Sequence, residues 1–237
     1  MSTYVYGITA ADHPLRLDGV PGVGEPAAPL RSVRSGTLTA VVSDAPPGLR
    51  AKRRDVQAHQ GVIEALMVDG ATLPMRFGLV APDDSEVAAA LEAEGENYLA
   101  RLEELEGHVE YNLKVAREED DLLREVVAES ERVRELRERT RDGAGTHEER
   151  LELGELVANE VAARRDAEAQ RLAEALSPKA KRVSVGEPTA SALLSVSFLV
   201  PASDVDSFVR AVQEQADRRG DGYTFTLTGP LPPYSFV

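Results

Sequence analysis

Strand-like patterns alternate with loops in the first part of the chain. Residues 3–9 and 37–43 are rich in β-branched and aromatic side chains, and they predict two strands. Between them, residues 12–30 are rich in Gly and Pro and show no periodicity, which indicates a long surface loop. Residues 71–80, ATLPMRFGLV, predict a short third strand, and the proline inside it favours an edge or irregular position.

Two amphipathic helices are expected in the same part. Over residues 51–68, apolar side chains recur at helical spacing, at Val56, Ile63, Leu66 and Met67. Gly70 follows as a candidate C-terminal cap. Asp83 and Glu86 have the spacing of a capping box, and they predict the start of a helix that runs to Glu106.

A fourth strand is expected directly after this helix. Residues 108–116 alternate polar and apolar side chains, which is the period of a half-buried strand. The resulting element order, ββαβαβ, is sufficient for one α+β domain. We therefore expect an N-terminal α+β domain over residues 1–116.

The middle of the chain predicts an acidic helical hairpin. Residues 117–140 carry a sparse apolar stripe, at Leu122, Val126, Val133 and Leu136. A glycine-containing break follows, and Thr146 with Glu149 has the spacing of a second capping box. Because the new helix ends before Pro178, we expect an antiparallel hairpin over residues 117–176.

Residues 177–237 predict a second compact unit. Strands are expected at 181–185 and 192–200, followed by a helix and a final alternating strand at 222–228. With the preceding helix this part reads αββαβ, a ferredoxin-like plait without its first strand. The chain ends in TGPLPPYSFV, whose three prolines predict an extended tail. The expected fold class is α+β, with two small ferredoxin-like domains joined by the acidic hairpin.

The charge of the chain is concentrated in one segment. Its 237 residues include 41 acidic and 27 basic side chains, which gives a net charge of −14. Residues 84–176 hold 27 of the acidic and 13 of the basic side chains, so the rest of the chain is neutral. This excess of negative charge argues against a nucleic-acid binder, and it predicts a hairpin that acts as a solvated spacer.

The residue types predict no catalytic, cofactor or metal site. The chain has no Cys, which excludes disulfides, thiolate metal sites and thiol nucleophiles. None of the four His has the spacing of a His-based metal motif, and each is expected to have a structural role. Residues 19–24 do not match a dinucleotide-binding glycine motif, and the acidic cluster at 118–121 is expected to be a solvated helix face.

Targeting and membrane signals are not expected either. The N-terminus has no signal-peptide pattern. The apolar runs are far shorter than the roughly 20 residues that a membrane-spanning helix needs. We therefore expect a cytoplasmic protein without a transmembrane segment.

One basic stretch, residues 50–54, stands out. Lys52, Arg53 and Arg54 fall at the expected start of a helix, where positive charge opposes the helix dipole by roughly a few tenths of a kcal/mol. Two interpretations remain open. The stretch is either a charged first turn, or a docking point for an acidic surface such as the hairpin of a neighbouring copy.

Three segments together resemble one known family. They are TYVYGI near the N-terminus, ATLPMRFGLV in the middle and GPLPPYSFV at the C-terminus. In this order and spacing the pattern resembles the GvpL/GvpF family of gas vesicle proteins, and the similarity covers essentially the whole chain. The resemblance implies a two-domain α+β protein with a helical segment between the domains. It also implies an accessory role in assembling gas vesicles alongside the small hydrophobic shell protein, without a catalytic residue, cofactor or metal.

The residues that carry the resemblance suggest structural contacts. Arg76 and Phe77 lie in LPMRFG, after a strand, where an Arg side chain can fork onto a carboxylate or backbone carbonyls. We expect Arg76 to tie the strand end to the C-terminal segment or to an interdomain hinge. Tyr234 and Phe236 would fray at a Pro-rich end unless both rings were buried. The tail is therefore expected to dock, on this chain or on a partner.

Two functions remain open at this point. The first is a non-enzymatic, gas vesicle associated assembly factor that binds the hydrophobic shell subunit, other accessory proteins, or both. Its charged hairpin would keep such a complex soluble. The expected contact residues are Lys52, Arg53, Arg54, Arg76, Phe77, Tyr234 and Phe236. The alternative is a small-molecule-binding or enzymatic module on ferredoxin-like domains, which requires a pocket lined by Arg76, His59 and carboxylates.

Overall fold

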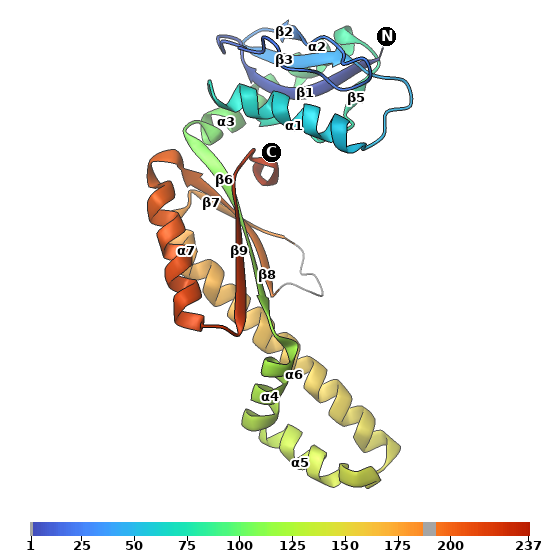
Figure 1. Ribbon diagram of the computed structural model, residues 1–237, viewed down its shortest axis with the longest axis vertical. Coiled ribbons are helices and arrows are strands. Elements are labelled where there is room, and N and C mark those ends of the chain that lie inside the picture. Colours follow the sequence, from blue (N-terminus) through green and yellow to red (C-terminus); the bar gives the residue numbers. More distant parts are fainter. Residues whose placement is uncertain (1, 187–192) are drawn as a thin grey trace. The chain divides into compact units, whose positions relative to one another are not determined.

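The computed structural model describes residues 2–186 and 193–237 and has a mixed α+β fold with two sheets (Figure 1). The α+β class expected from the sequence is confirmed. Contacts divide the chain into two compact units. Unit 1 consists of residues 1–110 and 230–237, and unit 2 consists of residues 111–229.

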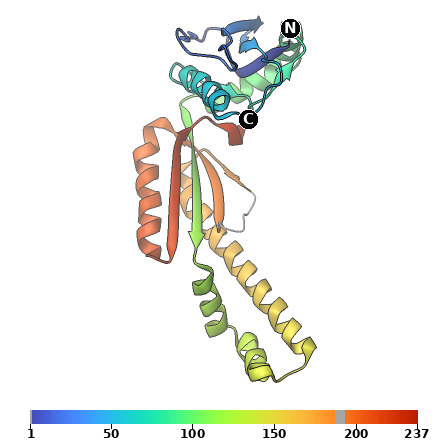
Figure 2. The same cartoon turned by 45° about the vertical axis from the view of Figure 1, so that its right-hand side comes forward.

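The sheet of unit 1 is built around β1 (Thr3–Ala10) (Figure 2). On one side β1 pairs antiparallel with β3 (Leu38–Asp44), which pairs in turn with β2 (Arg31–Ser35). On the other side it pairs with two short strands, β4 (Leu73–Pro74) and β5 (Val80–Ala81). β1 and β3 are buried along almost their whole length, so these two strands form the centre of the core.

Two of the three strand predictions hold closely, and one strand is new. The strands expected at 3–9 and 37–43 are confirmed as β1 and β3. The segment at 71–80 contributes β4 and β5 with irregular chain between them, so its irregular edge position is confirmed. β2 was not expected, because its sequence RSVRS buries only Val33 and shows no apolar period.

α1 (Arg53–Met67) confirms the helix expected over 51–68, and Ile63 and Leu66 of the expected stripe are buried. Val56, expected on the same stripe, is 39% exposed. The full set of buried residues is Asp55, His59, Val62, Ile63 and Leu66. The spacing of these five residues follows the helical period, and two of them are polar, so an apolar count alone places part of the stripe wrongly.

The end of α1 also differs from the expected one. The C-cap residue is Val68, in the right-handed conformation, and Gly70 does not cap the helix. A Cβ on Gly70 would lie 3.2 Å from Cδ2 of His13. Nε2 of His13 lies 3.0 Å from the carbonyl oxygen of Leu66, so this ring occupies the helix end. Gly70 is therefore needed for close packing rather than for capping.

The helix expected from Asp83 to Glu106 is two helices, α2 (Asp84–Ala93) and α3 (Gly95–Leu105). Asp83 is confirmed as the N-cap, because its carboxylate accepts the N–H groups of Ser85 and Glu86 at 2.9 and 3.0 Å. The two helices meet at a non-helical Glu94, directly before a glycine of low helix propensity.

The sheet of unit 2 contains β7 (Arg182–Val185), β8 (Leu194–Pro201), β6 (His108–Arg117) and β9 (Tyr223–Leu231), in that order. The strand expected at 108–116 is confirmed as β6, but its place in a ββαβαβ sheet is wrong, because β6 lies between β8 and β9. The strand expected at 192–200 begins at Leu194 in the structure, and residue 192 lies outside the described residues.

β6 supplies the first strand that the expected αββαβ unit lacked. With α6 (His147–Leu176) and α7 (Val205–Arg219), the order of elements is β6, α6, β7, β8, α7, β9. The apolar side chains of β6 and β8 include Leu113, Val115 and Phe198, all fully buried. The unit therefore has a core shared by strands that are about 85 residues apart in sequence.

The helical hairpin has α4 (Glu119–Glu129) and α5 (Glu131–Arg139) on one side and α6 on the other. The single helix expected at 117–140 is broken at Ser130, which has an extended conformation. The capping box of Thr146 and Glu149 is confirmed. The expected stripe is also confirmed, with every member buried: Leu122, Val126, Val133 and Leu136.

The C-terminal tail, residues 230–237, is only partly extended. β9 continues to Leu231, through the first proline of the tail. The chain then closes with a single 3₁₀ turn, Tyr234–Phe236, whose Phe236 N–H donates to the carbonyl of Pro233 at 3.1 Å. The fully extended tail expected from the prolines is therefore wrong for these last residues, since neither Tyr234 nor Phe236 is restrained as a proline is.

Candidate functional site

Two tyrosines of β1 form the base of the candidate site in unit 1. Tyr4 and Tyr6 are two positions apart in a strand, so their side chains lie on the same face of the sheet. Both are fully buried, and their ring centroids are 4.8 Å apart in an edge-to-face arrangement. α1 places His59 over them, and its ring centroid lies 5.6 Å from that of each tyrosine.

His59 uses both nitrogen atoms of its ring. Nδ1 lies 2.9 Å from the hydroxyl oxygen of Tyr4, and Nε2 lies 2.9 Å from the carbonyl oxygen of Met75. Because a carbonyl oxygen only accepts, Nε2 carries the proton and Nδ1 accepts from Tyr4. The tyrosine oxygen in turn accepts the N–H of Gly78 at 3.2 Å. Burial lowers the pKa of His59 and raises the pKa of Tyr4, which keeps both groups neutral.

The LPMRFG segment folds around this histidine. Met75 donates its N–H to the carbonyl of Tyr6 at 2.8 Å and accepts from His59 through its own carbonyl. Gly78 has a φ of 93°, a conformation that glycine adopts without strain. The ring of Phe77 is partly buried, and its centroid lies 5.7 Å from that of His59. The segment is thus held by its main chain and by one ring.

Arg76, in the middle of this segment, is exposed. Its guanidinium has no hydrogen-bond or ion-pair partner among the described residues. Only its carbonyl is engaged, accepting the N–H of Leu79 at 3.2 Å. Within the described part of the chain, the contact between this region and the C-terminal tail is made by other side chains.

The tail docks within unit 1, on its own chain. The hydroxyl oxygen of Tyr234 lies 3.3 Å from Nε2 of His59. Ser235 donates its N–H and its hydroxyl to the carboxylate of Glu110, at 3.0 and 2.6 Å. Phe236 and Glu110 are each 4% exposed. Burial raises the pKa of Tyr234 to about 12. Both aromatic side chains of the tail are therefore engaged, as the Pro-rich end requires.

The loop expected at 12–30 is fixed to the same core. The hydroxyl oxygen of Tyr6 accepts the N–H of Val23 at 2.8 Å, and Val23 is fully buried. The carboxylate of Asp55 accepts the N–H of Gly24 at 2.9 Å, and this bond holds the pKa of Asp55 below its usual range. A surface loop was expected, but its central part is instead a component of the core.

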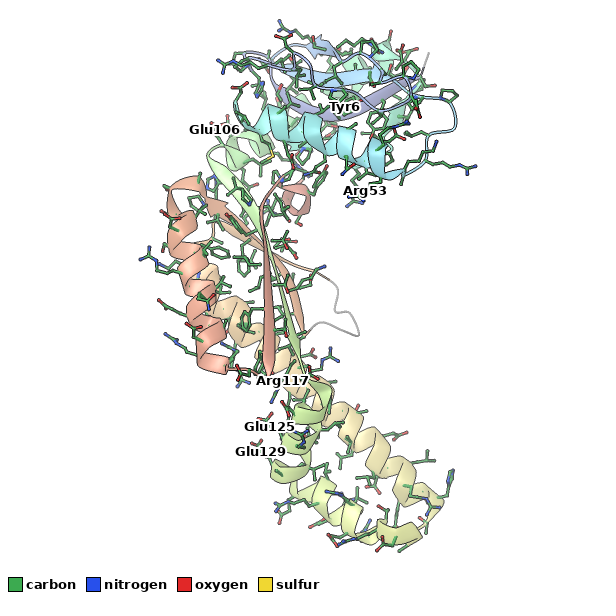
Figure 3. All side chains as sticks on the ribbon, viewed as in Figure 1. Tyr6, Arg53, Glu106, Arg117, Glu125 and Glu129 are labelled. Carbon is green, nitrogen blue, oxygen red and sulfur yellow. The ribbon has the colours of Figure 1, made fainter. Side chains whose placement is uncertain are left out.

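The basic stretch separates into paired and unpaired residues. Arg54 forms ion pairs with Glu25 and Asp55. Lys52 and Arg53 are exposed at the start of α1, and their side chains form no hydrogen bond or ion pair among residues 2–186 and 193–237. Figure 3 shows Arg53 at this end of the helix. Of the seven expected contact residues, Phe77 and Tyr234 meet at His59, whereas Lys52, Arg53 and Arg76 remain as exposed cations.

A cleft of about 630 Å³ opens in another part of unit 1. Neither Arg76 nor His59 lines it, so it is not the pocket that the small-molecule alternative requires. Its polar lining consists mainly of Asp12, His13, Asp69, Glu103 and Glu106. Among the described residues, no group of three or more His, Asp or Glu side chains is placed to hold a metal ion. No helix within the same ranges is both long enough and apolar enough to cross a bilayer.

Unit 2 has a polar cluster where β6 leads into the hairpin (Figure 3). Arg117 pairs with Glu125 of α4 at 2.5 Å and with Glu168 of α6 at 3.2 Å. Its guanidinium also lies 5.1 Å from the ring centroid of Tyr223, whose hydroxyl donates to Glu168. Burial raises the pKa of Tyr223 to about 12. One cation thus joins β6, both sides of the hairpin and β9.

Comparison with known proteins gives the family of the chain. Residues 2–237 match the family described as "Gas vesicle synthesis protein GvpL/GvpF". Gas vesicle protein F of Streptomyces sp. (strain CB03234) is 43% identical, with 100% of both chains covered. Gas vesicle protein L of the same strain is 31% identical over 99% of this chain and 92% of its own length.

A solved structure has the same fold. The crystal structure of the gas vesicle protein GvpF from Anabaena sp. PCC7120 superposes with a TM-score of 0.86, covering 99% of this chain and 97% of that chain at 22% identity. GvpF from Microcystis aeruginosa gives a TM-score of 0.81 at 23% identity, covering 99% and 98% of the two chains. At these identities the likeness concerns the fold, and the sequence match carries the assignment. The chain therefore belongs to the GvpL/GvpF family of gas vesicle proteins.

Proposed function

We propose that the protein is a non-enzymatic accessory factor in gas vesicle assembly, which binds the hydrophobic shell subunit, other accessory proteins, or both. The observation that carries this proposal is the family match over residues 2–237. The family description names gas vesicle synthesis, and the similar curated proteins are named gas vesicle proteins F and L. Localisation at the gas vesicle is part of the same proposal.

We also propose a division of labour along the chain, with partner contacts made by unit 1 and by the sheet of unit 2, and with the hairpin at 117–176 as a solubilising arm. The element order β-α-β-β-α-β supports a ferredoxin-like plait in the last part, completed by β6. The whole negative excess lies in residues 84–176, and a strongly charged arm keeps a complex with an apolar partner in solution.

The exposed cations are the proposed partner contacts of unit 1. The side chains of Arg76, Lys52 and Arg53 form no hydrogen bond or ion pair with a described residue, so binding a partner carboxylate breaks no existing ion pair. Arg54 is less suited to this role, because Glu25 and Asp55 already compensate its charge. Charge pairs at the rim of an interface act mainly on specificity and association rate.

Co-purification with the shell subunit tests the function. The shell subunit is produced together with the tagged chain, and we expect both in the soluble fraction and in the same complex. Replacing Arg76, Lys52 and Arg53 by Ala should weaken the complex without unfolding the chain. Arg101→Ala, an exposed position of α3 in the same unit, is the matched control. Association with neither the shell subunit nor any accessory protein would remove the proposal.

A further inference from the structure

The tail reaches unit 1 from a strand that belongs mainly to unit 2. The chain leaves unit 1 after Glu110 and returns only at Pro230. The returning residues, Gly229 and Pro230, are both exposed and lie directly before the docked turn. A docked segment that is joined to the rest of the fold through exposed residues can open locally at low free energy.

The surface that holds the tail is chemically specific. We use the name tail site for the surface formed by His59 and Glu110. His59 contacts the phenolic oxygen of Tyr234, and Glu110 accepts two hydrogen bonds from Ser235. The ring of the next residue, Phe236, is buried. Pro232 and Pro233 are buried as well, and their fixed φ angles place these groups at the correct spacing. The site is thus complementary to one short sequence, Pro-Pro-Tyr-Ser-Phe.

An empty tail site is unfavourable. When the tail leaves, the carboxylate of Glu110, which is 4% exposed within the folded chain, loses both donors that Ser235 provides. Opening also exposes the ring of Phe236, so a segment that supplies both donors and an equivalent buried ring regains the free energy lost on opening. The segment that restores all of them is a second tail of identical sequence.

We infer that the tail site accepts the C-terminal tail of a second copy of this chain, so that two copies exchange tails reciprocally. Exchange of an identical element preserves every contact of the closed form. The cost is the translational and rotational freedom that the two copies lose when they associate. At low concentration the tethered tail outcompetes the second copy, because tethering gives it an effective concentration on the order of millimolar. Exchange therefore grows where copies are crowded together. This inference concerns self-association and stands independently of the proposed function.

A labelled peptide measures the capacity of the site to bind a tail in trans. The probe is fluorescein-GPLPPYSFV, added to the purified full-length chain and followed by fluorescence anisotropy. The Y234A/F236A variant weakens the chain's own tail and leaves His59 and Glu110 unchanged. We expect it to bind the peptide at least tenfold more tightly than the intact chain does. Adding E110Q to this variant should reverse the gain by tenfold or more.

A control peptide, a milder variant and a sedimentation measurement complete the experiment. A peptide with Ala in place of its Tyr and Phe should not bind, and equal binding of both peptides overturns the inference. S235A, a milder change in the tail, should give an intermediate affinity and covers the case in which Y234A/F236A does not fold. Sedimentation of the intact chain at rising concentration should show a dimer that Y234A/F236A loses. A dimer that persists in that variant, or peptide binding no tighter than to the intact chain, overturns the exchange.

Discussion

The hydroxyl of Tyr4 donates to Nδ1 of His59 over 2.9 Å, and this bond joins β1 to α1 at the centre of unit 1. The other ring nitrogen of His59 holds the carbonyl of Met75 and faces the hydroxyl of Tyr234. One neutral imidazole therefore connects the three sequence segments that identify the family, from the start, the middle and the end of the chain.

Tyr4→Phe should destabilise unit 1. The change leaves the buried Nδ1 of His59 without its donor, and such a loss costs about 1–3 kcal/mol. It also removes the acceptor of the N–H of Gly78, but this residue is exposed and water can replace the lost bond. Urea unfolding followed by circular dichroism measures the loss. Tyr98→Phe is the matched control, because this partly exposed ring makes no hydrogen bond with a described residue. Equal midpoints for the two variants would contradict the assigned role of Tyr4.

His59 should make the stability of unit 1 fall on mild acidification. Burial lowers the pKa of His59 in the folded chain below its ordinary value of 6.5, so the unfolded chain binds the proton more readily. The free energy of unfolding is therefore highest above pH 6.5 and decreases as the pH falls below it, until the folded histidine is also protonated. His59→Gln should show a flatter profile between about pH 5 and 7. An unchanged slope in this variant contradicts the buried neutral state.

Asp84 should dominate a separate, more acidic transition. Arg31 and Thr3 donate to its carboxylate, at 2.8 and 2.5 Å, and they lower its pKa to about 2. Its stabilising contribution is complete above the ordinary value of 3.8 and is lost as the pH falls toward 2. Because both partners of the ion pair are partly exposed, Asp84→Asn should cost only about 0.5–1 kcal/mol at pH 7. The variant should also lose part of the wild-type slope between pH 4 and 2, measured by thermal unfolding.

Arg117→Met should loosen the base of the hairpin. The change removes the cation shared by Glu125, Glu168 and Tyr223, and it leaves two carboxylates close together. Hydrogen exchange of α4 amides should become faster, whereas amides of unit 1 keep their protection. Arg124→Ala is the control, since its side chain is 73% exposed and, among the side chains that the structure describes, it pairs with Asp121 alone. Similar exchange in the two variants would show that the seam of α4 is held by its apolar side chains alone.

Charge reversal on the hairpin separates solubility from recognition. Glu131, Glu148 and Glu155 are exposed and have no ion-pair partner in the described part of the chain. Replacing all three by Lys should lower solubility near neutral pH, with little effect on binding of the shell subunit. Turbidity and co-purification are measured on the same samples. Loss of binding at unchanged solubility would make the acidic arm the recognition surface.

The sequence predicts the elements of this fold better than their partners. Local periodicity identifies β6, yet its position between β8 and β9 depends on pairing across the chain, which no local pattern contains. The two polar residues on the buried face of α1 are a similar case. His59 lies four residues after Asp55 and three before Val62, which is helical spacing, but its burial is favourable only because Tyr4 and Met75 satisfy both nitrogens.

The site shows the same limit. Phe77, Tyr234 and Phe236 were selected because their motifs resemble the family, and aromatic rings at such places are expected to be buried. Glu110 carries no signal of its own, because it is one of many acidic residues between 84 and 176 and alternates with apolar positions as an exposed residue would. Only the fold shows that its carboxylate meets Ser235.

The return of residues 230–237 to unit 1 has a consequence for synthesis. Since a chain emerges from the ribosome N-terminus first, the first unit to appear is the last to be completed. Until residues 230–237 are released, Glu110 has no Ser235 to bind, and His59 has no Tyr234. A chain interrupted before residue 230 therefore carries its defect in its N-terminal unit, because the residues that complete this unit are synthesised after all of unit 2.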